Sequence, residues 1–191
     1  MASESFLWDT CVIYRWFNPS PVEYKDHIKA FLKDAEEKKV EIFVSTISLA
    51  EIGPSKMGKS GLSPRQVLSS MSKALVFVDT TPDIMSLAGH LRDQTYRHAE
   101  GPDDKAASRL LSLGDSIHLA TAVALREEYG VQNLSFHTFD EGKRKDSEIG
   151  KKTVPMIGFQ NWCRDCQDDE EVRRVMDLSR NKPVHPSCPL P

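Results

Sequence analysis

Short apolar runs alternate along the chain with longer segments in which apolar residues recur at helical spacing. Each short run predicts a buried strand, and the runs lie at 6–8, 42–44, 75–78, 134–139 and 154–157. The helical spacing predicts helices between and after these runs, at 22–39, 46–52, 82–96, 113–125 and 168–180. Strands that alternate with helices predict an α/β fold, a three-layer α/β/α sandwich around a mostly parallel central sheet.

Two segments are expected to lack regular structure. Residues 56–65 are rich in Gly, Ser and Lys, and residues 181–191 are rich in Pro, which indicates a basic loop and a poorly ordered tail. The string at 53–60 matches the GxxxxGKS pattern of a phosphate-binding loop. Such a loop follows a buried strand and opens a long helix, whereas this string follows a helical segment. We therefore interpret the match as chance.

The segment 113–125 predicts the central helix, because it is too apolar for an exposed position and suits burial against a sheet. Asp115 stands at its entrance, directly after a glycine. Taken alone, this acid is typical of a helix cap or a first-turn residue, whose charge suits the positive end of the helix dipole. It indicates function only if other carboxylates occupy equivalent places.

Further acids follow the predicted strands. Asp9 comes after 6–8 and Asp140 comes after 134–139, while Glu51 lies one turn into the helix after 42–44. The carboxyl ends of parallel strands meet at one edge of a sheet. We expect that edge to carry four carboxylates: Asp9, Glu51, Asp115 and Asp140. Carboxylates so close raise one another's pKa unless a cation neutralises them, and such hard oxygen ligands suit Mg²⁺ or Mn²⁺.

Two other polar residues near this edge have simpler interpretations. His118 lies one helical turn after Asp115, but a histidine inside an apolar helix is more often a hydrogen-bonded core residue. We do not assign it to catalysis. Asp79 also ends a predicted strand, and the Thr-Thr-Pro sequence that follows it indicates a turn.

Four segments of the chain, in this order, resemble the motifs of the PIN domain family. They are Leu7-Trp8-Asp9-Thr10, Ser45-Thr46-Ile47-Ser48-Leu49-Ala50-Glu51-Ile52, Gly114-Asp115-Ser116-Ile117-His118-Leu119-Ala120-Thr121-Ala122 and His137-Thr138-Phe139-Asp140. The similarity covers roughly residues 5–158. It predicts a PIN-like nuclease domain at 1–158, followed at 159–191 by a C-terminal helical extension and the Pro-rich tail.

The resemblance implies a metal-dependent endoribonuclease that hydrolyses RNA phosphodiester bonds with Mg²⁺ or Mn²⁺. Many such proteins are VapC-type toxins, so it also implies an antitoxin protein and a homodimer as partners. The implied catalytic and metal-binding residues are Asp9, Glu51, Asp115 and Asp140. Asp9 and Asp115 are the principal ligands in this interpretation, and the matching hydroxyl groups of Thr10 and Thr138 orient carboxylates or water.

Basic side chains near the acids are candidates for contacts with RNA phosphates. They are Lys56, Lys59, Arg65, Lys143, Arg144 and Lys145. The alternative is that most of them are solvated surface charges. The overall balance does not decide the matter, since 25 Lys and Arg against 28 Asp and Glu give a net charge of −3.

Other classes of protein fit the sequence less well. A haloacid-dehalogenase-type phosphatase also begins with an acid after its first strand, but it needs a second acid two positions on, where Cys11 stands. A zinc site would combine the CxxC pair, Cys163 and Cys166, with Cys188 and His185 of the tail. A catalytically silent PIN-like RNA-binding or scaffold domain stays open as the alternative function.

The sequence predicts a cytoplasmic protein with no membrane contact. No apolar run approaches the roughly 20 residues that span a bilayer. The first residues also lack the basic and then apolar pattern of a secretion signal. At 191 residues, the chain suits one domain, or one domain with an extension.

Overall fold

A computed structural model describes residues 4–17, 23–53, 63–101, 108–142 and 153–190. Its helices are α1 (Thr10–Phe17), α2 (Lys25–Glu36), α3 (Ile47–Glu51), α4 (Pro64–Met71), α5 (Pro82–Asp93), α6 (Leu113–Glu127) and α7 (Glu170–Met176). Its strands are β1 (Glu4–Trp8), β2 (Val40–Ser45), β3 (Leu75–Val78), β4 (Leu134–His137) and β5 (Ser179–Asn181). A 3-10 helix lies at Phe159–Trp162.

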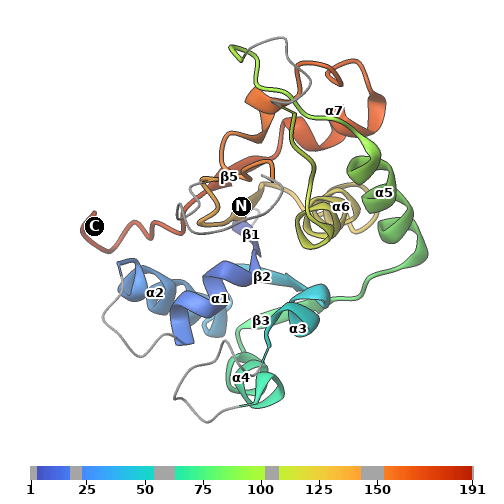
Figure 1. Cartoon of the computed structure of the whole chain (residues 1–191). Coiled ribbons are helices and arrows are strands. Elements are labelled where there is room, and N and C mark those ends of the chain that lie inside the picture. The colour runs from blue at the N-terminus through green and yellow to red at the C-terminus, as the bar shows by residue number, and fades with distance from the viewer. Residues whose placement is uncertain (1–3, 18–22, 54–62, 102–107, 143–152, 191) are drawn as a thin grey trace.

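The described strands form one sheet in the order β3-β2-β1-β4-β5, and every pairing is parallel. Helices cover both faces, with α1 and α2 on one side and α5, α6 and α7 on the other (Figure 1). The predicted three-layer α/β/α sandwich is therefore confirmed, and the mostly parallel sheet is wholly parallel in the described residues.

Alternation along the strands divides the core between the two faces, because successive side chains of a strand point to opposite sides. Phe6 and Trp8 of β1 pack with apolar residues of α1 and α2. Leu7, between them, packs with α5, α6 and α7. The helix α6 is buried along most of its length, since a small-residue face at Ala120 and Ala124 meets α5 on its outer side. This burial fixes the position of the first turn of α6.

The apolar run at 154–157 is not a strand, so that prediction is wrong. Val154 and Met156 are fully buried, which explains the apolar signal, but they pack as irregular chain. The backbone N–H groups of Met156 and Ile157 are bonded to Asp140 instead of a neighbouring strand.

The last strand is β5, which pairs in parallel with β4 and comes from a segment expected to be helix and tail. The predicted helix at 168–180 is shorter, because α7 ends at Met176. The prediction of a poorly ordered tail from residue 181 is also wrong for the described residues. His185 is buried, its backbone N–H donates to His27 Nδ1 at 2.9 Å, and its Nε2 lies 2.9 Å from Asp34 Oδ2.

The helix α4 was not predicted. Its start carries a capping box, in which the Ser63 hydroxyl accepts from the Gln66 N–H and the Gln66 side chain accepts from the Ser63 N–H. That serine, followed by proline and then glutamine, was a usable signal for a helix start. None of the helices in the described residues has both the length and the apolar character that a membrane span requires.

Candidate functional site

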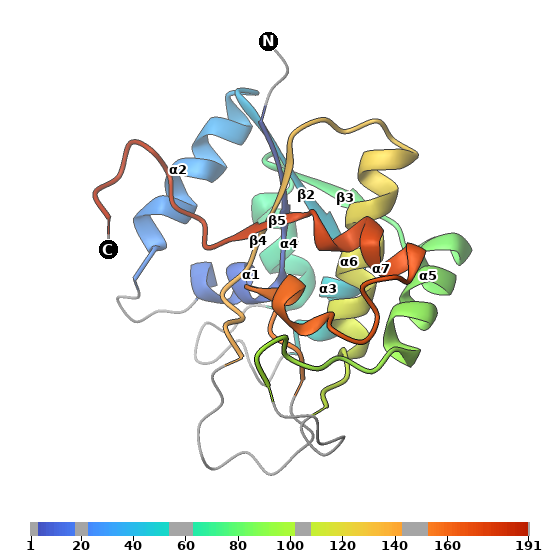
Figure 2. The same ribbon diagram turned by 90° about the horizontal axis from the view of Figure 1, so that it is seen from above.

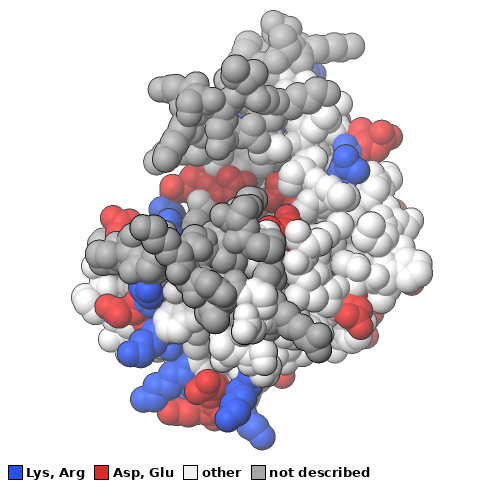
Figure 3. Space-filling model, turned by 60° about the horizontal axis from the view of Figure 1, so that its bottom comes forward, with Lys and Arg blue, Asp and Glu red and all other residues white. Residues whose placement is uncertain are grey.

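The four predicted acids lie where the elements meet the carboxyl ends of the strands. Asp9 directly follows β1, Glu51 ends α3, and Asp115 lies in the first turn of α6. Asp140 follows β4 by three residues. Figure 2 shows α1, α3 and the beginning of α6 on the side of the sheet toward which β1 and β2 run. The face drawn in Figure 3 has a hollow in which Asp and Glu side chains gather.

Asp9 is 7% exposed and is held by donors from two strand exits. Its Oδ2 accepts from the Thr138 hydroxyl at 2.6 Å and from the Cys11 thiol at 3.0 Å. Burial and the charge of Asp9 raise the pKa of Cys11, so that thiol stays protonated and donates. Thr138 thus orients a carboxylate. The sequence did not indicate this role for Cys11, because its apolar surroundings are typical of a core thiol.

Glu51 packs against the start of α6. A hydroxyl, that of Thr10, is hydrogen-bonded to its Oε2. Its Oε1 lies so close to Gly114 that a Cβ added there would stand 1.8 Å from it. Glycine at position 114 is therefore what allows α3 and α6 to approach with a carboxylate between them. Glu51 is half-buried, unlike the exposed helical glutamate that its sequence position alone suggests.

His118 is fully buried and lies among the acids. Its Nε2 is 3.3 Å from Glu51 Oε2 and 3.8 Å from Asp9 Oδ1. Burial acts to lower the pKa of His118, but the hydrogen bond to Glu51 and the charges of Asp9 and Glu51 raise it above its ordinary value. Its Nδ1 has no hydrogen-bond partner in the described part of the chain. From the sequence we expected His118 in the core, and its hydrogen-bond partner there is Glu51.

Asp115 is both a first-turn residue and a member of this group. The N-cap of α6 is Ser112, whose hydroxyl accepts from the Asp115 N–H at 3.0 Å and lies 2.5 Å from Asp115 Oδ2. Burial raises the pKa of Asp115 to about 6, and the charges of Asp9 and Asp140 add to the shift while the Ser112 hydroxyl opposes it. The first-turn interpretation of Asp115 is therefore confirmed, and its assignment as a metal ligand stays a prediction.

The carboxylate of Asp140 also organises its own loop. Its Oδ1 accepts from the Gly142 N–H at 2.9 Å, and its Oδ2 accepts from the Met156 N–H at 3.2 Å. Asp140 acts on Asp115 through its charge. The charges of Asp9 and Asp140 thus act on Asp115, and the charges of Asp9, Glu51 and Asp115 act on His118.

Two observations bear on whether these four acids fit a divalent cation. The donors are carboxylate oxygens, which Mg²⁺ and Mn²⁺ prefer. Burial raises the pKa of Asp115 most, and the charges of Asp9 and Asp140, which add to the shift, are what a cation would offset. Within the described ranges, however, no three His, Cys, Asp or Glu residues are arranged as a ready metal-binding group. The donor chemistry fits a cation, and side-chain rearrangement is required to hold it.

The remaining candidates from the sequence are the basic residues, the GxxxxGKS string and the zinc ligands. The cationic candidates Lys56, Lys59, Lys143, Arg144 and Lys145 lie outside the described residues, as do residues 54–60 of the GxxxxGKS string and the side chain of Arg65. Cys163 and Cys166 are buried near α7. His185 is bonded to α2, and the described residues bring no zinc-binding group together.

Comparison of the sequence with protein-family models gives no match, and comparison with curated proteins gives none either.

Proposed function

We propose that this protein is a metal-dependent endoribonuclease of the PIN type, which hydrolyses RNA phosphodiester bonds with Mg²⁺ or Mn²⁺. The observation that carries the proposal is the meeting of Asp9, Asp115 and Asp140, from separate elements, closely enough that the charges of the other two help raise the pKa of Asp115. Clustered charge of one sign at a partly open edge is unfavourable for folding, so it favours a functional explanation.

In this proposal Asp9 and Asp115 are the principal metal ligands, with Glu51 and Asp140 completing the site directly or through water. When held by these residues, a divalent cation would stabilise negative charge on the attacked phosphate and would lower the pKa of a water molecule. Thr138 holds the Asp9 carboxylate in place, as its hydrogen bond to Oδ2 supports. Thr10 and His118 do the same for Glu51.

The second candidate is a catalytically silent PIN-like domain that binds RNA or serves as a scaffold. Two observations favour it: the absence of a ready three-ligand group in the described residues, and the engagement of Asp140 with backbone N–H groups. In such a domain, His118 supplies positive charge beside Asp9 and Glu51 in place of a metal.

The experiment is cleavage of an end-labelled single-stranded RNA with Mn²⁺, Mg²⁺ or a chelator. The variants are Asp115→Asn and, as a matched control, Asp79→Asn, which alters an exposed acid after β3. We expect metal-dependent cuts by the parent and by Asp79→Asn, and a loss of at least about 100-fold in rate for Asp115→Asn. RNA binding without cleavage by the parent would favour the silent domain. The antitoxin and the homodimer stay predictions of the resemblance.

A further inference from the structure

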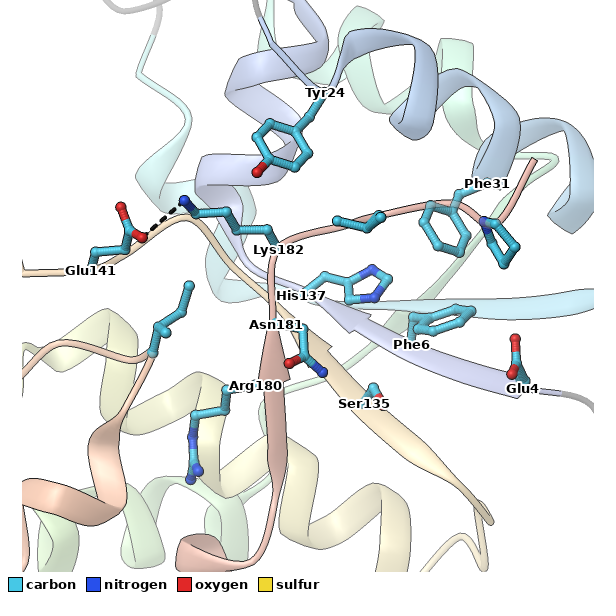
Figure 4. A pocket seen from close by; sticks show the side chains of 13 residues that line it. Glu4, Phe6, Tyr24, Phe31, Ser135, His137, Glu141, Arg180, Asn181 and Lys182 are labelled. Carbon is cyan, nitrogen blue, oxygen red and sulfur yellow. Dashed lines mark ion pairs between the residues drawn. The ribbon is translucent and has the colours of Figure 1, made fainter. Parts of the chain in front are cut away.

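A cavity of about 620 Å³ opens on the α2 side of the sheet, between that helix and the chain that follows β5. Aromatic rings form its inner part and polar side chains surround its mouth (Figure 4). The Phe6 and His137 rings stack with centroids 4.4 Å apart, and Phe31 meets Phe6 edge-on at 4.9 Å. These three rings are 3–8% exposed and form the wall of the cavity, while the half-buried Tyr24 ring is the more open aromatic surface for contact with a flat ring system.

His137 provides a directed hydrogen-bond donor in this cavity. The residue is 4% exposed. Its Nδ1 accepts from Trp8 Nε1 at 3.2 Å. Since indole N–H only donates, the remaining imidazole proton is on Nε2. That N–H has no hydrogen-bond partner among the described residues, although His137 lines the cavity.

The mouth carries a cation and a further aromatic ring. Lys182 Nζ lies 5.8 Å from the centroid of the Tyr24 ring. Lys182 also pairs with Glu141 at 2.9 Å. Tyr24 has a φ of 71°, an uncommon left-handed conformation for a bulky residue, at the N-cap of α2. Asn181 adds an exposed amide, which both donates and accepts.

The cavity and the acid site share one short stretch of chain. His137 lines the cavity, Thr138 bonds Asp9, and Glu141, again at the cavity, directly follows Asp140. The Thr138 N–H also donates to the Asn181 carbonyl oxygen at 3.0 Å. One end of the cavity, at Glu141 and its ion-pair partner Lys182, therefore adjoins Asp140 along the chain.

We propose that this cavity is a nucleotide-binding subsite, in which one base of a single-stranded RNA contacts the aromatic rings while Lys182 meets its phosphate. Base stacking on aromatic side chains, together with polar contacts to base edges, is how proteins hold unpaired nucleotides. His137 Nε2–H donates to an acceptor on the base edge, and the Asn181 amide supplies a second polar contact. The subsite deepens the proposed nuclease function and rests on it for the identity of the polymer.

The first test is calorimetric titration with each of the four nucleoside 5′-monophosphates in the presence of a chelator, so that it does not depend on catalysis. We expect at least one nucleotide to bind the parent. Its affinity should fall about tenfold in His137→Phe and about fivefold in Lys182→Met and Asn181→Ala. Lys33→Met, at a lysine whose side chain is 73% exposed on α2, is the control and should bind like the parent. Binding of no nucleotide, or equal binding by all variants, overturns the proposal.

The second test separates this inference from the nuclease itself. Lys182→Met and Asn181→Ala leave the buried core intact, so their folding is not at issue. We expect both to raise KM for single-stranded RNA with kcat little changed. If the parent cleaves RNA and both variants have an unchanged KM, the subsite proposal is wrong and the nuclease proposal stands. If nucleotide binding depends on these residues but the parent does not cleave RNA, the nuclease proposal is wrong and the subsite proposal stands.

Discussion

Asp115 is the residue at which burial and the neighbouring carboxylates have their clearest energetic effect. Burial, with help from Asp9 and Asp140, raises its pKa to about 6, which means that the folded chain disfavours its ionised form. A raised acid pKa leaves the fold unaffected below the unfolded value near 4. It destabilises the fold progressively as pH rises toward 6, and fully above that.

Asp115→Asn should therefore stabilise the metal-free protein at pH 8. We expect the free energy of unfolding to rise by roughly 1–2 kcal/mol, and to change little at pH 4. The amide oxygen of Asn still accepts from Ser112. Urea unfolding with a chelator, at both pH values, measures the difference. An equal or lower unfolding free energy for the variant at pH 8 would show that burial and the neighbouring acids do not disfavour the ionised form of Asp115 as described.

Gly114 should matter for activity more than for stability. In Gly114→Ala the new Cβ meets Glu51 Oε1, which lies at the end of a flexible side chain and moves away. We expect cleavage of RNA to fall by at least about tenfold, while the unfolding temperature changes by only a few degrees.

Gly89→Ala in α5 is the matched control for that variant, because a Cβ there meets nothing within 4 Å. It should keep full activity and gain up to about 1 kcal/mol of stability, as alanine favours the helix. Equal activity in the two variants would show that the close approach of Glu51 to α6 does not matter for cleavage.

The sequence predicted where the four acids lie, because each stands at a place that strand and helix patterns define. The supporting residues had weaker signals. Ser112 is one more serine before a helix, and Cys11 looks like a core residue, so their bonds to Asp115 and Asp9 became visible only in three dimensions. The role of Gly114 depends on a side chain more than sixty positions away in the chain.

At the scale of elements, Arg180 shows how β5 is held against α7 and why the apolar pattern of the sequence did not predict this strand. The strand is short and polar, so no apolar run marks it. Its central arginine is nevertheless buried, because the guanidinium donates to the carbonyl oxygens of Val175, Met176 and Leu178 at the end of α7. The side chain also lies 4.8 Å from the centroid of the Phe159 ring.

Replacement of Arg180 by Met should uncouple α7 from β5. The change keeps the apolar stem but leaves buried carbonyl oxygens without donors, so we expect a loss of roughly 2–3 kcal/mol in unfolding free energy. Arg173→Met, on the exposed side of α7, should change stability by less than about 0.5 kcal/mol. Chemical unfolding of both variants measures the contrast, and equal values would contradict the role given to Arg180.

At the scale of the whole molecule, the alternation of strands and helices was sufficient to predict the layered fold. It did not predict which segment supplies the last strand, because Val154 and Met156 are buried without strand pairing while β5 has little apolar character. The expected domain boundary at residue 158 separates the candidate site from β5, although β5 pairs with β4 in the same sheet.

A chain that ends at residue 158 should fail to fold as a stable unit. Val172, Val175 and Leu178 belong to the same apolar core as α6, and removal of β5 leaves β4 as an unpaired sheet edge. We expect aggregation or loss of cooperative thermal unfolding in the truncated chain. Cooperative unfolding at the temperature of the full chain would instead identify residues 159–191 as a separable extension.

The most direct test of the central claim, that the clustered acids form one cation site, is calorimetric titration with Mn²⁺ at pH 8, where Asp115 is ionised. We expect the parent and Asp79→Asn to bind Mn²⁺ with equal affinity, and Asp115→Asn to bind it at least about tenfold more weakly. Equal Mn²⁺ affinity of the parent and Asp115→Asn, or no binding by the parent, would contradict the claim.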